Sequence, residues 1–124
     1  MEKTRIEEFV RNGKAFIYID LSNLKTNDEF DKMTKIIEPA VAKYPENSLY
    51  TVTNIENIRI DTESKKNIVR YLKHNKPYVK YGAVIGLDGI KKLIVTTTLK
   101  LSGRNNIIFA FTKEQAIELL LRQE

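Results

Sequence analysis

Four short apolar runs, each followed by a more polar segment, constrain the fold of this chain more than any other feature. They read KAFIYIDL at 14–21, SLYTVTNI at 48–55, YVKYGAVIGL at 78–87 and NNIIFAF at 105–111. The runs are rich in β-branched and aromatic residues, and they are nearly continuous rather than alternating. That pattern is typical of strands covered on both faces. We therefore expect four strands of a mostly parallel sheet.

Each run is followed by a segment with helical periodicity, as a crossover helix between parallel strands requires. These segments cover 27–44, 60–75, 88–103 and 112–124. The residues expected to cap them are Asn27 or Asp28, Asp61 or Thr62, Asp88, and Thr112. The alternation predicts an α/β fold, a four- to five-stranded mostly parallel sheet with flanking helices. A length of 124 residues suits a single domain over 1–124.

The N-terminal segment TRIEEFVRNG, at 4–13, fits two structures. Thr4 followed by Glu7 matches a capping box, and Gly13 would end a short helix. Asn12-Gly13 is equally a hairpin signal. We favour the helix, and the sequence leaves a hairpin strand at 4–12 open.

Composition excludes several classes of function. The chain has no cysteine, so disulfides, thiol nucleophiles and thiolate metal sites are ruled out. No stretch approaches the ~20 apolar residues of a membrane helix, and the charged N-terminus lacks a signal-peptide core, so we expect a cytoplasmic protein. His74 is the one histidine, and no carboxylates cluster at ligand-like spacing. We expect no catalytic residue, no metal site and no cofactor.

Positive charge is concentrated in residues 65–104, which carry ten basic side chains and one acidic one, Asp88. We favour the explanation that these basic side chains lie on solvent-exposed helix faces. Binding of nucleic acid is the less favoured alternative. The anion-binding candidates are Lys76, Lys80, Lys91, Lys92 and Arg104. Because a strand separates the two lysine pairs, we expect them at opposite ends of the sheet. Among the nearby tyrosines, we expect Tyr81 in the core and Tyr71 half-buried.

The stretch VIGLDG, at 84–89, has the spacing of a GxxG loop that grips a nucleic-acid backbone. Asp88 would place an anion where phosphates approach, and a strand precedes the loop. We therefore interpret the stretch as a strand-to-helix turn. Gly86 ends the strand, Asp88 caps the helix, and Gly89 lets the backbone pass closely.

Several segments together resemble the small SpoIIAA-like proteins of the STAS class, which are also similar to SEC14-type lipid-binding domains. They are GKAFIYIDLSNL at 13–24, SLYTVTNIENIRID at 48–61, NKPYVKYGAVIGLDGIKK at 75–92 and SGRNNIIFAFTKEQAIELLL at 102–121. The resemblance covers most of the chain from Gly13 onward and includes no catalytic signature. It implies a sheet with helices packed against it, in a binding or regulatory module.

The resemblance also implies a regulatory loop. Anti-sigma-factor antagonists of this class switch partners when a serine in an Asp-Ser-Ser-Gly loop is phosphorylated. That loop maps onto 61–64, where Glu63 stands at the usual phosphoacceptor position. Thr62 and Ser64 are therefore the phosphoacceptor candidates, at a helix N-terminus that favours a phosphate. The candidates for partner or ligand binding are Asp20, Ser22, Asp61, Thr62 and Ser64.

We prefer a non-enzymatic STAS-like module that binds an unknown protein partner, with homodimerisation left open. The alternative is a SEC14-like carrier of a small apolar or anionic ligand, which would need a cavity of at least ~300 Å³. Nucleic-acid binding through residues 65–104 comes third.

Overall fold

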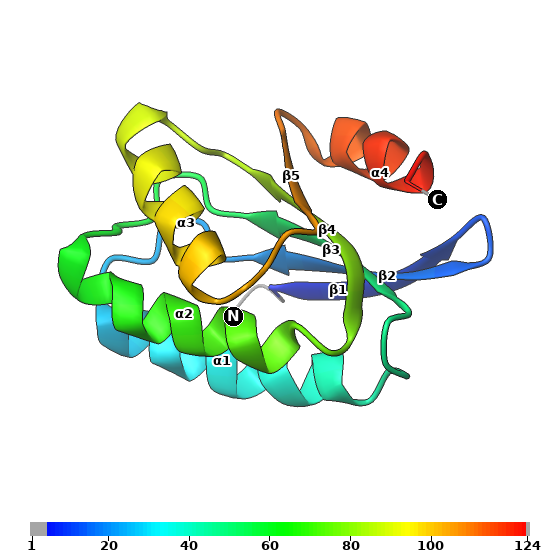
Figure 1. The fold of residues 1–124 in the computed structure, drawn as a ribbon, viewed down its shortest axis with the longest axis horizontal. Coiled ribbons are helices and arrows are strands. Elements are labelled where there is room, and N and C mark those ends of the chain that lie inside the picture. Colours follow the sequence, from blue (N-terminus) through cyan, green and yellow to red (C-terminus); the bar gives the residue numbers. More distant parts are fainter. Residues whose placement is uncertain (1–4, 124) are drawn as a thin grey trace.

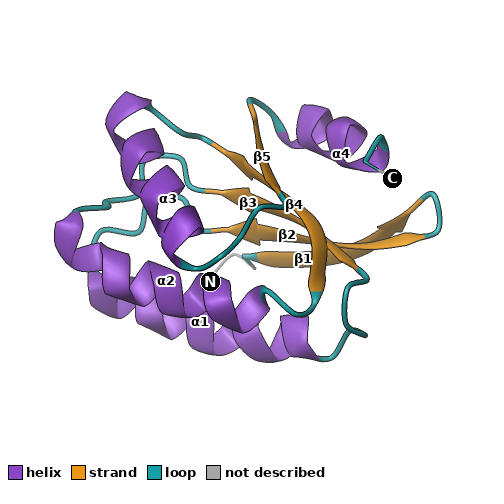
Figure 2. Cartoon of the chain, in the orientation of Figure 1, coloured by secondary structure: helices purple, strands orange, loops and turns teal. Residues whose placement is uncertain are grey.

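The computed structural model describes residues 5–123, apart from the side chains of Thr62 and Ile90, as one sheet with helices on both faces (Figure 1). The strands are β1 (Ile6–Arg11), β2 (Lys14–Asp20), β3 (Leu49–Asn54), β4 (Val79–Ile85) and β5 (Ile107–Ala110). The helices are α1 (Asn27–Ala42), α2 (Lys65–Asn75), α3 (Gly89–Leu101) and α4 (Lys113–Leu121). A 3₁₀ turn, η1 (Thr62–Ser64), leads into α2 (Figure 2).

The sheet follows the order of the chain, β1-β2-β3-β4-β5. Strands β2 to β5 are parallel to one another, and β1 is antiparallel to β2. All four predicted strands and the helix after each of them are confirmed. Because sequential order and right-handed crossovers place every connection on one face, α1, α2 and α3 lie together on that face (Figure 1). The order never reverses, so the sheet lacks the crevice that a reversal creates.

The N-terminal helix that we favoured is wrong, and the hairpin alternative is correct. Asn12 and Gly13 both have positive φ, at 54° and 76°, as a tight two-residue hairpin turn requires. Phe9 lies opposite Phe16 on β2, and their rings stack with centroids 5.2 Å apart. As a strand, this segment forms backbone hydrogen bonds with β2, whereas so short a helix is only marginally stable by itself.

Successive residues of each strand point to opposite faces of the sheet and pack into two separate cores. This explains why the apolar runs are nearly continuous. On β2, Ile17 and Ile19 are buried in the core beneath α1, α2 and α3. Phe16 points the other way and packs in a second core with Ile117 of α4. The remaining buried members of the second core are Tyr50, Val52, Ala83, Ile85, Ala116 and Leu120.

Local hydrogen bonds fix where the helices begin. Asp61, Asp88 and Thr112 accept hydrogen bonds from backbone N–H groups as predicted, and they begin η1, α3 and α4. Helix α1 is capped by Thr26 rather than by Asn27 or Asp28. Thr26 forms a capping box in which its hydroxyl accepts from Glu29 N and the Glu29 carboxylate accepts from Thr26 N.

The end of α3 turns the chain inward. Gly103 has a φ of 73°, Gly103 N donates to Lys100 O at 3.1 Å, and Arg104 N donates to Leu99 O at 2.9 Å. This pair of bonds is a Schellman motif, with Gly103 as its left-handed residue. The motif ends the helix as predicted and directs Arg104 back toward the interior.

The turn between β4 and α3 also follows the interpretation made from sequence, except at one glycine. Gly86 has a φ of 86°, and a Cβ placed on it would lie 2.5 Å from Glu56 N. A Cβ on Gly89 would meet no atom within 4 Å. The close backbone approach expected at Gly89 is therefore wrong, and it occurs at Gly86.

Candidate functional site: a polar edge and an interior pocket

The loop that follows β2 is held in shape by hydrogen bonds centred on Asp20. The Asp20 Oδ1 atom accepts from Ser22 N at 2.9 Å and from Ser22 Oγ at 2.5 Å. From outside the loop, Arg5 Nη1 donates to Asp20 O at 3.0 Å and to Ser22 O at 2.8 Å. These bonds fix both residues at the carboxyl end of β2.

The segment before α2 is organised by Asp61 and Ser64. Asp61 Oδ1 accepts from Ser64 N at 3.1 Å, and Asp61 N donates to Ser64 Oγ at 3.2 Å. The Ser64 hydroxyl also lies 3.2 Å from Asn27 Oδ1 on α1, and Ser64 is 6% exposed. Ser64 is thus a buried capping residue that links η1 to α1. The side chain of Thr62 lies outside the described residues.

Hydrogen bonds join these two loops into one surface. Asn23 N donates to Glu56 O at 3.0 Å, and Arg59 N donates to Leu24 O at 2.8 Å. The Lys25 ammonium reaches the carbonyl of Asn57 at 2.8 Å. We call residues 20–27 and 55–64 the carboxyl edge. Asp20 and Ser22 thus lie at the same edge of the sheet as Asp61 and Ser64.

A surface groove of about 220 Å³ crosses part of the carboxyl edge. Its lining carries both signs of charge and three hydroxyl or amide side chains: Lys25, Thr26, Asn27, Arg59, Asp61, Glu63 and Ser64. Arg59 and Asp61 approach each other to 3.8 Å, and both side chains remain largely accessible. Asp20 and Ser22 flank this groove without lining it.

The structure separates the anion-binding candidates. Lys76 and Lys80 line a groove of about 420 Å³ beside the amino end of β4, together with Asn47, Asn105 and Asn106 among others. Lys91 and Lys92 begin α3, beyond the carboxyl end of β4. Lys91 Nζ lies 3.4 Å from Asp88, and Lys92 Nζ lies 5.5 Å from the centre of the Phe109 ring.

Arg104, the fifth candidate, is 7% exposed and points into the protein. Arg104 therefore shares no exposed face with the four lysines. The Schellman motif at the end of α3 places this residue against the helix it follows, and that position usually packs inward.

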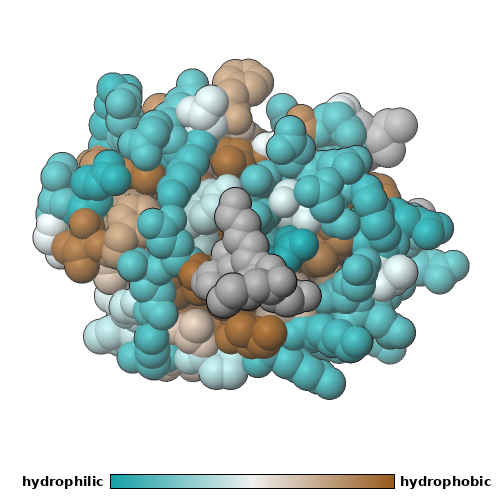
Figure 3. Space-filling model, turned by 180° about the vertical axis from the view of Figure 1, so that it is seen from behind, coloured by the Kyte–Doolittle hydropathy of each residue, from teal (hydrophilic) through white to brown (hydrophobic). Residues whose placement is uncertain are grey.

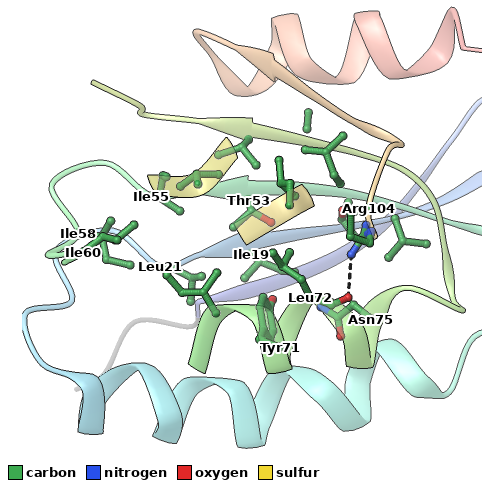
Figure 4. A pocket seen from close by; sticks show the side chains of 18 of the residues that line it. Ile19, Leu21, Thr53, Ile55, Ile58, Ile60, Tyr71, Leu72, Asn75 and Arg104 are labelled. Carbon is green, nitrogen blue, oxygen red and sulfur yellow. Dashed lines mark hydrogen bonds between the residues drawn. The ribbon is translucent and has the colours of Figure 1, made fainter. Parts of the chain in front are cut away.

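Arg104 lines an interior pocket of about 80 Å³ between the sheet and helices α2 and α3 (Figure 4). Most of its walls are apolar side chains, including Ile19, Leu21, Ile55, Ile58, Ile68, Val95 and Leu99. Figure 4 shows Ile55, Ile58 and Ile60 at one end and Arg104 with Leu72 and Asn75 at the other. The pocket is therefore apolar along its length and polar at one end.

Three side chains form this polar end. Arg104 Nη1 donates to Leu72 O at 3.1 Å, and Arg104 Nε donates to Asn106 Oδ1 at 3.1 Å. Tyr71 is 5% exposed, and its hydroxyl has no hydrogen-bond partner of ordinary geometry among the described residues. Asn75 is buried beside it and contacts His74 through its Oδ1 atom, 2.9 Å from His74 Nδ1.

Burial changes the acidity of this group. It raises the pKa of Tyr71 far above the usual phenol value, although the nearby Asn75 amide and the Arg104 charge act in the opposite direction. Burial lowers the pKa of Arg104 to about 10, so that the guanidinium still carries its charge at neutral pH. The polar end of the pocket is therefore a neutral phenol beside a buried cation.

This pocket was not predicted from the sequence, because arginine is seldom buried in folded proteins. Two local signals point to it. Arg104 follows the helix-ending Gly103, at the inward position of a Schellman motif. Tyr71 and Asn75 are four residues apart on α2, hence on one face of that helix.

The described residues lack two features that other functions would require. No group of three or more histidine, cysteine, aspartate or glutamate side chains at 5–123 is arranged to hold a metal ion. In the same part of the chain, no helix combines the length and apolar character needed to cross a membrane.

Solved structures with the same fold are known, although they are distant in sequence. An uncharacterized protein of the DUF3478 family with a SpoIIAA-like fold, from Shewanella loihica PV-4, superposes with a TM-score of 0.68 at 13% identity, over 97% of this chain and 98% of that chain. An anti-sigma-factor antagonist (STAS) domain protein from Planctomyces limnophilus gives a TM-score of 0.59 at 11% identity, over 93% of this chain and 97% of that chain. No protein-family model and no curated protein matches the sequence. The chain thus has the SpoIIAA-like, STAS-like fold that its sequence predicted.

Proposed function

We propose that this protein is a non-enzymatic regulatory module of the cytoplasm that binds a protein partner through its carboxyl edge. The proposal rests on the hydrogen bonds that join the loops after β2 and β3 into one polar surface. Pre-formed loops lose little conformational freedom when they bind a partner, which favours recognition. The likeness to a STAS domain protein described as an anti-sigma-factor antagonist supports the same kind of role.

The chemistry of the groove at this edge suggests what a partner must present. Lys25 and Arg59 stand beside Asp61 and Glu63, so that a complementary surface must alternate in charge. Large exposed apolar side chains lie on β1, α1, α3 and the turn after β5: Val10, Ile36, Leu93, Leu101 and Phe111. The rear face likewise shows hydrophobic areas that are small and separated by hydrophilic side chains (Figure 3). We therefore infer a partner held by polar contacts.

Regulation by phosphate at this edge would involve Thr62 rather than Ser64. The Ser64 hydroxyl is buried and engaged with Asp61 and Asn27, so a kinase would have to open the η1 segment to reach it. A phosphate on Thr62 would add negative charge to the carboxyl edge, which changes the surface that a partner meets.

The test is affinity capture from a lysate of the native cell, with mass spectrometry of retained proteins. The tagged chain is compared with an edge variant, Arg59→Glu combined with Glu63→Lys, which exchanges two exposed charges. Glu118→Lys is the control, because Glu118 is an exposed glutamate on α4, across the sheet. We expect a protein that the unmodified chain and the control retain and the edge variant loses. A partner retained equally by all three would refute the carboxyl edge as its binding surface.

A carrier of a small ligand is the second candidate, and the interior pocket favours it. At about 80 Å³ the pocket is far smaller than the ~300 Å³ of an ordinary ligand site, so it suits a small guest and not a lipid. Nucleic-acid binding has weaker support, because the lysine pairs lie at opposite ends of β4. If it occurred, its affinity would fall steeply with salt concentration.

A further inference from the structure

Arg104 is a buried cation for which the chain supplies no counter-ion. No carboxylate lies within ion-pair distance of its guanidinium in the described part of the chain, although Arg104 is 7% exposed. A buried charge is ordinarily paired, because removal from water disfavours an isolated ion. The charge of Arg104 is therefore balanced incompletely by the protein itself.

The hydrogen bonds of Arg104 use only part of its donor capacity. Nε is directed at the Asn106 amide oxygen and Nη1 at the Leu72 carbonyl, and both acceptors are neutral. A guanidinium has five N–H donors, and the second terminal nitrogen, Nη2, makes no hydrogen bond to a described residue. Arg104 therefore has donors that no acceptor of the described chain occupies.

Tyr71 provides an independent observation at the same place. Its side chain is 95% buried, its ring is fixed by an edge contact with Phe30 at 5.7 Å, and its hydroxyl makes no hydrogen bond of ordinary geometry within the described chain, although the Asn75 amide lies beside it. Figure 4 shows the ring rising from α2 with its oxygen toward the sheet, on the pocket side. A buried hydroxyl without a partner is uncommon, and it marks a position where an acceptor is missing.

We propose that the interior pocket binds a small organic monocarboxylate with a short apolar chain. The carboxylate lies at the polar end, where it accepts hydrogen bonds from the Arg104 guanidinium and the Tyr71 hydroxyl. The chain extends between the sheet and α2 toward Ile55 and Ile58. This ligand supplies the missing charge and the missing acceptor together, and its tail meets walls that are mostly apolar.

Size and charge narrow the class of ligand. An engineered apolar cavity of about 150 Å³ accommodates benzene, so a pocket of about 80 Å³ admits only a guest that is smaller than benzene. The planar fork of a guanidinium matches the two oxygens of a carboxylate. A phosphate dianion would bring a second negative charge that one arginine leaves unbalanced. The shortest acids, such as propionate, therefore fit better than phosphate or long-chain fatty acids.

The competing explanation is that Arg104 only clamps the end of α2 through the Leu72 carbonyl. A cation at a helix C-terminus is stabilising without any ligand. That role predicts no saturable binding of carboxylates, and it assigns no purpose to the unpartnered Tyr71 hydroxyl. The two accounts therefore differ in a measurable way.

The experiment is a titration of the ¹⁵N-labelled full chain, followed by NMR at constant ionic strength. The probes are sodium propionate, sodium octanoate, propan-1-ol and propylammonium chloride. We expect propionate to cause saturable shifts at residues 71–75 and 104–107, with propan-1-ol weaker by about tenfold or more, because it lacks the charge. Octanoate should bind more weakly than propionate, and propylammonium should not saturate. Absence of saturation by propionate, or equal binding of propan-1-ol, would overturn the proposal.

Two variants locate the site within the chain. Tyr71→Phe keeps the ring and removes only the hydroxyl, and Arg104→Lys keeps the charge and removes the fork. We expect several-fold weaker propionate binding for the first and about tenfold weaker binding for the second. Arg122→Met, which removes an exposed arginine after α4, is the matched control and should bind like the unmodified chain. Should Arg104→Lys fail to fold, Tyr71→Phe and the probe series decide; unchanged affinity in Tyr71→Phe and Arg104→Lys would refute the site.

Discussion

Gly86 is the residue at which the backbone itself limits substitution. It combines a φ of 86° with a position where a Cβ would lie 2.5 Å from Glu56 N and 2.8 Å from Glu56 Cα. Both obstacles are backbone atoms of the carboxyl edge, so neither can rotate away. We expect Gly86→Ala to lower the free energy of unfolding by roughly 2 kcal/mol or more, measured by urea denaturation.

Gly89 provides the matched control three residues further on. It begins α3, its φ is not in the left-handed region, and the space around a Cβ is open. Gly89→Ala should therefore leave stability unchanged or raise it by about 0.5–1 kcal/mol, because alanine is the better helix former. If both variants lost equal stability, the close approach at Gly86 would not be the cause.

Glu8 predicts a pH dependence of stability. Hydrogen bonds from the Tyr44 hydroxyl and the Lys43 ammonium lower the pKa of Glu8 below its ordinary value of 4.5 in the folded protein. The resulting stabilisation is complete above the unfolded pKa and is lost as the pH falls through the folded one. Glu8→Gln should therefore cost up to about 1 kcal/mol at neutral pH, limited by solvent screening, and almost nothing near pH 3.

The measurement is urea denaturation of both proteins across this pH range. Glu118→Gln is the control, since no ion pair of Glu118 is found within 5–123. Its stability difference from the unmodified chain should stay flat with pH. A Glu8→Gln difference that is equally flat would show that the contacts with Lys43 and Tyr44 contribute nothing.

At the residue scale, sequence predicts turn chemistry better than burial of polar groups. Asp88 and Thr112 cap their helices as expected, because a cap depends on residues within one turn. Tyr71 was expected half-buried and is buried, and the burial of Arg104, a candidate for anion binding, was not predicted. Their burial depends on how α2 and α3 meet the sheet, which local sequence does not specify.

The N-terminus of α1 provides a prediction at the scale of an element. Thr26 Oγ1 accepts from Glu29 N at 3.1 Å, and the Glu29 carboxylate returns the contact to Thr26 N. We expect Thr26→Ala to lower the free energy of unfolding by about 1 kcal/mol, because it leaves a first-turn N–H group unsatisfied.

Thr26→Ser is the matched control, since serine retains the capping hydroxyl. Chemical denaturation should show it within a few tenths of a kcal/mol of the unmodified chain. An alanine variant as stable as the serine variant would mean that Asn27 or Asp28, the caps expected from sequence, can replace Thr26.

Segments whose hydrophobic pattern fits one secondary structure were predicted correctly. The N-terminal segment, whose pattern fits both a helix and a strand, was not. The four long apolar runs have no helical alternative, and each is a strand. Residues Ile6, Phe9 and Val10 suit a helix by spacing and a hairpin strand by their proximity to Asn12-Gly13. Pairing with β2 across the hairpin decides for the strand, and it leaves Val10 70% exposed.

For the whole molecule, the separation into two cores means that α4 alone covers the far side of the sheet. Ile117 is fully buried there against the strands. Ile117→Ala should lower the free energy of unfolding by about 2–5 kcal/mol, through lost burial and the cavity left behind. Glu118→Ala, on the exposed side of the same helix, should change it by no more than about 0.5 kcal/mol. A similar cost for both in thermal or urea unfolding would contradict the docking of α4.

The α/β class and the order of strands and helices could be predicted from sequence, and the joining of the loops at the carboxyl edge could not. Asp20 ends one predicted strand and Asp61 follows the next, and open α/β sheets place ligands at the carboxyl ends of their strands. The bonds that unite their loops, such as Arg59 N to Leu24 O, link residues distant in the chain. No local pattern records such bonds.

The central claim, that the carboxyl edge binds a protein partner, is tested most directly by hydrogen–deuterium exchange of the complex with the captured partner. The account predicts that amides at 20–27 and 55–64 exchange more slowly in the complex than in the free chain, while those of α4 and the β1–β2 hairpin are unchanged. Protection confined to α4 or to the hairpin, with the carboxyl edge unaffected, would contradict it.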